Sequence, residues 1–233
     1  FSNCTSLESI TIPSSVTSIG SRSFSYCTSL KSITIPSSVT TINNSLFYNC
    51  TSLESITIPS SVTTISDSSF SDCTSLKSIT IPPSVTTIGK NSFSNCTSLE
   101  SITIPSSVTT IGYKSFSKCT SLKSIIIPSS VTSIEEGAFE RCENLESVSL
   151  NAQIKKIEKE TFSDCSSLSQ ISIPDSVQNI NEKAFFYCKS LKEITLPKTL
   201  IGIDLSAFAN SSINIISIPN RVTIYPSGIY LFN

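Results

Sequence analysis

The stretch "CTSLESITIP" at residues 4–13 returns as "CTSLKSITIP" at residues 27–36, and close copies continue along most of the chain. A phenylalanine opens each copy, and these residues stand 23 positions apart: Phe1, Phe24, Phe47, Phe70, Phe93, Phe116, Phe139, Phe162, Phe185 and Phe208. All nine cysteines keep the same period. One copy reads F-x-x-C-x-x-L-x-x-I-x-I-P-x-x-V-x-x-I, which predicts a stack of similar units.

Within one copy, the pattern predicts two extended segments and one tight turn. Ile10 and Ile12 alternate with Thr11, so the isoleucines face a core and the threonine faces solvent. Pro13 ends this strand because it cannot donate a ladder hydrogen bond. The V-x-x-I segment predicts a second, shorter strand, and the spacing of F-x-x-C predicts a single helical or 3₁₀ turn.

A single 23-residue copy cannot bury its inward side, whereas copies stacked in register place Leu over Leu and Ile over Ile. The sequence therefore predicts one domain over residues 1–233, a curved solenoid of about ten coils with a parallel sheet on its concave face. Residues 208–233 predict an irregular last coil or C-terminal cap, because Ser211 replaces the cysteine. The chain starts inside a copy and contains no methionine, so we expect a fragment of a longer protein.

The consensus LxxIxIPxxVxxIxxxxFxxC resembles the BspA-like, or Treponema pallidum type, leucine-rich repeat over essentially the whole chain. The seventh copy departs from it, with Val148, Leu150, Asn151 and Ile154 in place of Ile, Ile, Pro and Val. The resemblance implies an α/β leucine-rich-repeat solenoid dominated by β-structure. It also implies a surface-exposed or secreted protein of a mucosal microbe or protozoan parasite, since some members act as adhesins toward host proteins or other cells.

The cysteines allow three interpretations: a metal site, a set of disulfides, or packing as small apolar side chains. A zinc site needs clustered ligands, but no two cysteines are closer than 23 residues and the chain has no histidine. Disulfides between stacked coils would need distorted geometry, because neighbouring strands lie about 4.8 Å apart with parallel side chains. Packing is favoured, since Cys4 lies between the inward positions Phe1 and Leu7. We expect no metal, no cofactor and no catalytic residue.

Function is expected on the outward positions of the first strand of each copy, because the fold does not need them. They form a serine column that starts at Ser9, a threonine column that starts at Thr11, and a column of alternating charge that starts at Glu8. A solvated surface favourable to β-structure accounts for the same residues. The partner-binding candidates are Glu8, Ser9, Thr11, Lys31, Thr34, Glu54, Thr57, Lys77, Thr80, Glu100, Thr103, Lys123 and Glu146.

Five N-x-[ST] triplets add conditional N-glycosylation sites, which apply if the protein is eukaryotic and secreted. Their asparagines are Asn3, Asn43, Asn49, Asn95 and Asn210.

The composition argues against some classes of partner. Charged residues make up 14% of the chain, its formal net charge is -1, and like charges do not cluster, so nucleic acid is not expected as a partner. The apolar runs are too short for membrane insertion of this segment. An enzyme is disfavoured because a repeating surface presents the same groups in every coil.

The leading hypothesis is a cell-surface or secreted module that binds a host or cell-surface protein or glycan. The alternatives are a structural spacer, a rod assembled by end-to-end self-association, and, least favoured, a lattice-binding surface. Copies seven to nine diverge most from one another, so we expect partner specificity there.

Overall fold

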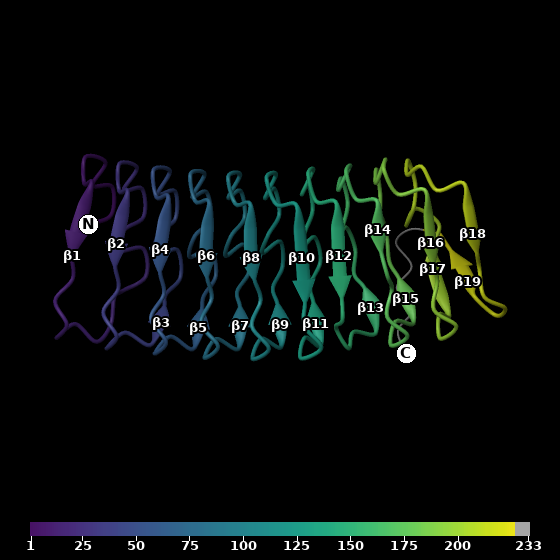
Figure 1. Cartoon of the computed structure of the whole chain (residues 1–233), viewed down its shortest axis with the longest axis horizontal. Coiled ribbons are helices and arrows are strands. Elements are labelled where there is room, and N and C mark those ends of the chain that lie inside the picture. The colour runs from purple at the N-terminus through teal and green to yellow at the C-terminus, as the bar shows by residue number, and fades with distance from the viewer. Residues whose placement is uncertain (227–233) are drawn as a thin grey trace.

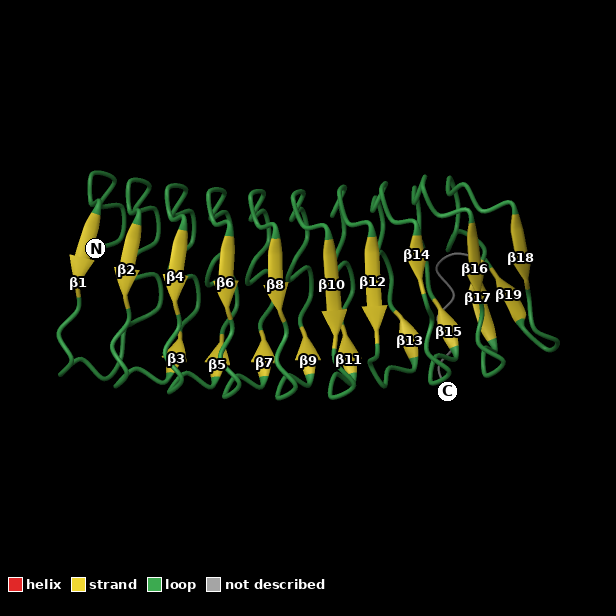
Figure 2. Cartoon of the chain, in the orientation of Figure 1, coloured by secondary structure: helices red, strands yellow, loops and turns green. Residues whose placement is uncertain are grey.

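The S-I-T segments form strands because serine and threonine face solvent while the isoleucine between them packs inward. The computed structural model describes residues 1–226, which wind into a solenoid with one such strand per coil (Figures 1 and 2). This first series consists of β1 Ser9–Thr11, β2 Ser32–Thr34, β4 Ser55–Thr57, β6 Ser78–Thr80, β8 Ser101–Thr103, β10 Ser124–Ile127, β12 Ser147–Leu150, β14 Gln170–Ile171, β16 Glu193–Thr195 and β18 Ile215–Ser217. We call its outward side the hydroxyl face.

The V-x-x-I segments form the predicted second series of short strands, whose isoleucine is buried in every strand from β3 to β17 and exposed in β19. They are β3 Thr41–Ile42, β5 Thr64–Ile65, β7 Thr87–Ile88, β9 Thr110–Ile111, β11 Ser133–Ile134, β13 Lys156–Ile157, β15 Asn179–Ile180, β17 Gly202–Asp204 and β19 Thr223–Tyr225. Pairing is parallel in both series, and Ile79 lies beside Ile102 just as Ile88 lies beside Ile111. The predicted parallel solenoid with in-register coils is confirmed.

The pairing is interrupted at three junctions within residues 1–226. In the first series it stops between β8 and β10 and between β14 and β16, and in the second series between β11 and β13. The interruptions never fall at the same junction, so each pair of neighbouring coils keeps at least one set of strand hydrogen bonds. At the seventh copy, Asn151 replaces proline and its N–H donates to Ile127 O at 3.0 Å, which accompanies the longer β10 and β12.

The F-x-x-C segments differ from the prediction of a helical turn, because residues 1–226 contain no helix. Each segment is a single turn, such as the one in which Cys96 N–H donates to Phe93 O at 3.2 Å. Two residues with positive φ flank the phenylalanine, for example Asn91 (φ 51°) and Asn95 (φ 60°), and they stop right-handed helix from continuing. Their N–H groups donate to Tyr113 O and Ser117 O in the next coil, so these turns form a third ladder.

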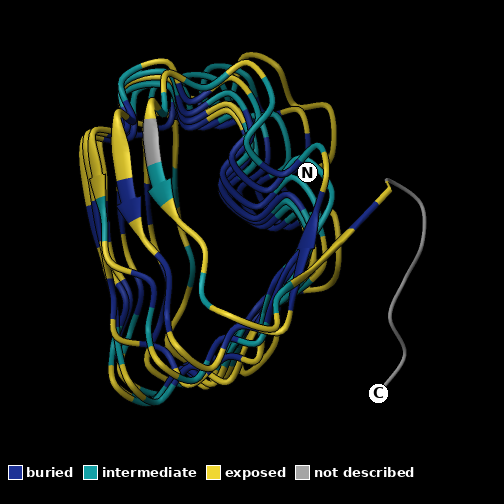
Figure 3. Ribbon diagram, turned by 90° about the vertical axis from the view of Figure 1, so that its right-hand side faces the viewer, coloured by how far each residue is buried: buried dark blue, intermediate teal, exposed yellow. Residues whose placement is uncertain are grey.

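The core is one continuous cluster along the stack, enclosed by the coils as seen along the solenoid axis in Figure 3. Its largest members are the repeated phenylalanines, whose rings stack from Phe1 to Phe208 with centroids 5.3–5.7 Å apart and interplanar angles of 3–17°. These separations fall in the range of favourable offset stacking. The last described coil is shorter, since β16 pairs Glu193 with Ile215 rather than with the residue 23 positions on.

Candidate partner-binding surface

The structure places all of the predicted partner-binding side chains where the sequence indicated. From Glu8 to Glu146, every one is exposed on the hydroxyl face or immediately before its strands. Their accessibility is therefore confirmed, while their contact with a partner stays a prediction.

The alternating charge column forms ion pairs at two of its junctions. Lys31 Nζ lies 2.9 Å from Glu8 Oε2, and Lys77 Nζ lies 3.3 Å from Glu54 Oε2. All four side chains are more than 60% exposed, so each pair contributes at most about 1 kcal/mol to stability. The main effect of the pairs is to neutralise the N-terminal part of the hydroxyl face.

A groove of about 950 Å³ crosses the hydroxyl face over β12, β14, β16 and β18. These are the last four strands of the first series (Figure 1). Its exposed lining includes Ser149, Gln170, Glu193, Thr195 and Lys198. The groove lies over the β14–β16 junction, where the strand pairing is interrupted. It therefore combines a concave shape, hydroxyl and amide groups, and charges of both signs.

A second hollow of about 470 Å³ adjoins the groove at the N-terminal ends of β14 and β16. It shares Ser169, Gln170 and Glu193 with the groove and adds Lys189 and Lys192. The hydroxyl face is thus hollowed in two adjoining places over coils eight and nine.

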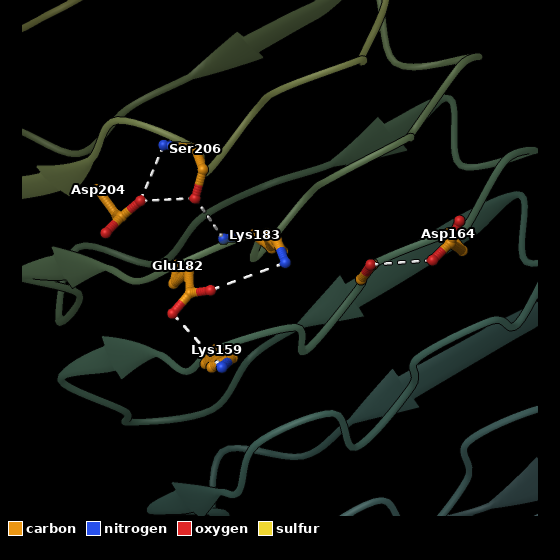
Figure 4. A network of polar contacts seen from close by, with 7 residues as sticks. Lys159, Asp164, Glu182, Lys183, Asp204 and Ser206 are labelled. Atoms are coloured by element: carbon orange, nitrogen blue, oxygen red, sulfur yellow. Dashed lines mark hydrogen bonds and ion pairs between the residues drawn. The ribbon is translucent and has the colours of Figure 1, made fainter. Parts of the chain in front are cut away.

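A second polar cluster spans coils seven to nine (Figure 4). Glu182 forms ion pairs with Lys159 at 3.4 Å and with Lys183 at 3.8 Å, and Ser206 Oγ accepts a hydrogen bond from Lys183 N–H at 3.2 Å. Ser206 in turn donates its N–H and its hydroxyl to Asp204 Oδ1, at 2.8 and 2.7 Å. These bonds tie successive coils together, and we assign the cluster a structural role.

The cysteines occupy the core, as their packing interpretation predicted, except for Cys4. Eight are buried, and each thiol donates to the carbonyl oxygen of a phenylalanine 26 residues earlier, for example Cys96 Sγ to Phe70 O at 3.2 Å. Cys4 was expected on the inner wall and is instead exposed, because the first coil has a neighbouring coil on one side only.

The conditional glycosylation sites differ in accessibility. Asn3 and Asn210 are exposed, whereas the other three are half-buried. Asn43 Nδ2 donates to Ile19 O at 2.7 Å, and Asn95 Nδ2 donates to Asp72 Oδ1 at 2.6 Å, so these two amides support the stack. Modification of any of the five stays a prediction.

Residues 1–226 contain neither a cluster of metal ligands nor a membrane-spanning helix. No group of three or more His, Cys, Asp or Glu side chains there is arranged to hold a metal ion. No helix in the same range has the length and apolar character to cross a membrane.

The sequence did not identify two sets of residues: serines that support the stack and several residues that line the groove. The second serine of most P-S-S segments is structural, since Ser107 Oγ donates to Val85 O at 2.6 Å and its equivalents repeat that bond. Gln170, Glu193, Thr195 and Lys198 line the groove but were not among the predicted residues. The divergence of copies seven to nine was the available signal, and the groove lies over that part of the chain, while partner specificity there stays a prediction.

Known proteins with this pattern and architecture were identified by three comparisons. The family described as "BspA type Leucine rich repeat region" matches residues 1–123 and 110–232 in six copies. No curated protein sequence matches the chain.

Several solved structures are similar. A leucine-rich repeat protein of Bacteroides ovatus is 29% identical with a TM-score of 0.62, covering 97% of this chain and 76% of its own. A leucine-rich cell surface protein of Faecalibacterium prausnitzii is 28% identical with a TM-score of 0.54, covering 97% and 75%. The T. pallidum leucine-rich repeat protein is 32% identical with a TM-score of 0.64, covering 69% and 78%.

Proposed function

Because the chain belongs to the BspA-type leucine-rich repeat family, we propose that it is a non-enzymatic, adhesin-like binding protein that engages a cell-surface or host macromolecule through its hydroxyl face. The observation that carries the proposal is the groove over β12, β14, β16 and β18. Binding sites are typically concave and present a few polar groups, and this groove interrupts an otherwise repetitive surface.

The location of the groove supports the proposal. It lies in the coils whose sequences diverge, so its lining is unlike the rest of the hydroxyl face: Gln170 and Glu193 stand in the column that holds serine in the first seven coils. A partner that recognises this lining could not bind equally well to the regular coils. The groove thus provides one specific site on a repeating surface.

We place the protein at the cell surface or outside the cell, as part of the same proposal. Support comes from the F. prausnitzii relative, which is described as a cell surface protein. The hydroxyl-rich exterior, in a chain whose formal net charge is -1, is compatible with exposure to many partners without strong nonspecific attraction to polyanions.

The test is attachment of beads that carry the chain to cultured epithelial cells and to immobilised matrix proteins. Thr195→Trp and Ser149→Trp each place an indole in the groove and should lower attachment roughly tenfold, as expected when a contact of about 1.4 kcal/mol is lost. Thr57→Trp is the matched control, because Thr57 is an exposed strand residue of the same face outside the groove. Circular dichroism confirms that all three variants fold.

Attachment that both groove variants retain would contradict the proposal. Loss of attachment in Thr57→Trp alone would move the binding surface to the regular coils and would also contradict it. In that case the charge column would be tested next, with substitutions at Lys77, Glu100 and Lys123.

A structural spacer is the second candidate, and the unbroken phenylalanine stack favours it. Ten rings in contact along one axis make a stiff element, and the exposed Phe1 ring offers a stacking surface for end-to-end association. Light scattering distinguishes a monomeric spacer from a rod assembled end to end. A mass that rises with protein concentration supports assembly, and a constant monomer mass excludes it.

A further inference from the structure

The charge column loses its alternation in the eighth coil, which leaves a lysine without an acidic neighbour. Lys31 and Lys77 each pair with the glutamate of the preceding coil. Lys192 occupies the same position in the ninth coil, but Ser169 precedes it in the column and Asn214 follows it. Within residues 1–226, Lys192 forms no ion pair.

Lys192 lies in the second hollow together with another lysine. Lys189 also lines this hollow and makes no ion pair within the described part of the chain; its Nζ sits 4.1 Å from the centre of the Tyr187 ring. Lys198 adds a third positive charge in the adjoining groove. Glu193 is the one carboxylate among the side chains that line the two hollows, so their lining is positive in a chain whose formal net charge is -1.

The lining of the second hollow favours a carbohydrate over a protein. Its side chains are serine, lysine, glutamine and glutamate, and none of them is the aromatic or large apolar anchor that usually dominates protein interfaces. Serine hydroxyls and a glutamine amide can donate to and accept from sugar hydroxyls.

Periodicity is a second argument for a polymer. One exposed hydroxyl per coil lines the groove, from Ser149, Ser172, Thr195 and Ser217, and paired neighbouring strands lie about 4.8 Å apart. A chain of repeating sugar units can meet such a surface at several coils at once, which a single folded loop cannot. Lysine ammonium groups bind sulfate as point charges, and neither Lys189 nor Lys192 forms an ion pair within residues 1–226.

We propose that the two hollows over coils eight and nine bind a sulfated polysaccharide, with Lys189 and Lys192 contacting its sulfate groups. This inference rests on the proposed function, because it names the chemistry of the partner that the same face would recognise. Glu193 lines both hollows, and its carboxylate disfavours a sulfate group beside it.

The test measures binding of a heparin-derived octasaccharide to the chain by isothermal titration calorimetry, with hyaluronan and poly-glutamate as unsulfated polyanions. The octasaccharide should bind, and its affinity should fall as salt rises, because sulfate contacts release counterions. Lys189→Gln with Lys192→Gln should weaken binding roughly tenfold, the upper range for two exposed charge contacts.

Two further variants make the test specific to the broken alternation. Ser169→Glu restores the acidic neighbour of Lys192 and should weaken binding without removing a lysine. Glu193→Gln removes the repelling carboxylate and should strengthen binding several-fold. Lys77→Gln is the matched control, since Lys77 has the same position in its coil but is already paired with Glu54, and it should change binding little.

Binding of poly-glutamate in preference to the octasaccharide would overturn the inference in favour of an acidic protein partner. Absence of octasaccharide binding, or equal losses in Lys77→Gln and Lys192→Gln, would also overturn it. The proposed function is tested separately: attachment to cells that depends on Thr195 while the octasaccharide does not bind would reject the sulfated ligand alone. Octasaccharide binding without attachment to cells or matrix would reject the adhesin role alone.

Discussion

Raising the pH from 8 to 10 should strongly destabilise this protein, because its buried thiols ionise freely only when it unfolds. Burial raises the pKa of Cys50, Cys142 and Cys188 to about 12. It also raises the pKa of four other thiols well above the ordinary value of 9.0: Cys73, Cys96, Cys119 and Cys165. In each case desolvation is the largest cause, since a thiolate in this apolar stack would lose its water.

The sign and size of the effect follow from proton linkage. The folded pKa lies above the unfolded one, so this contribution to stability is complete below pH 9 and is lost as the pH rises toward the folded value. Between pH 8 and 10, each thiol of the unfolded chain releases its proton and favours unfolding by about 1.4 kcal/mol. Seven thiols together lower the free energy of unfolding by on the order of 10 kcal/mol, comparable with the entire stability of a typical domain.

The assay is urea unfolding followed by circular dichroism at pH 8, 9 and 10, with reductant and constant ionic strength. The urea midpoint should fall steeply and should recover when the pH returns to 8. A double variant, Cys96→Ala with Cys119→Ala, should lose about two sevenths of the pH dependence, because its seven ionising thiols become five. A midpoint at pH 10 equal to that at pH 8 would refute the burial of protonated thiols.

Three further predictions concern the stack itself. Phe116→Ala should lower the free energy of unfolding by about 3–5 kcal/mol, because Phe116 is fully buried between two rings. Phe1→Ala should lower it by less than about 1 kcal/mol, because Phe1 is 65% exposed. Equal losses of stability in urea unfolding would contradict the stacking. Ser92→Ala and Ser115→Ala should each stabilise the protein by about 1 kcal/mol in the same assay, because their buried hydroxyls have no hydrogen-bond partner within residues 1–226. Alanine already fills the equivalent position of the next coil, at Ala138. Ser69→Ala is the control and should not stabilise the protein, because it removes a hydrogen bond to Ser66 O. Thiol labelling at pH 8 should quickly modify one cysteine of the native protein, Cys4, and all nine cysteines after denaturation without reductant. If only about one free thiol were labelled in the denatured protein, the other cysteines would be in disulfides.

The period of the sequence was sufficient to predict the architecture. Phe, Cys, Leu and Ile recur at fixed positions, and only stacking in register buries them all, so both strand series and the core follow. The turn around each phenylalanine was not predictable in the same way. Its i, i+3 spacing is shared by a helix and by a single turn, and the left-handed residues that decide between them include Lys114 and Arg141, which have no special preference for that conformation.

The candidate surface was predictable in part. Alternation along each strand identified the outward residues, and their exposure is confirmed from Glu8 to Glu146. The groove was not predictable, because it depends on an interrupted pairing between β14 and β16 and on the path of the backbone over four coils. Sequence divergence indicated coils seven to nine but did not identify a concave surface there.

Recognition over coils seven to ten of the hydroxyl face can be tested by hydrogen–deuterium exchange with and without a saturating bound partner. We expect new protection in the segments that line the groove, residues 169–172 and 192–198, and unchanged exchange in β2, β4 and β6. Protection confined to β2, β4 and β6, or to the phenylalanine turns, would contradict it.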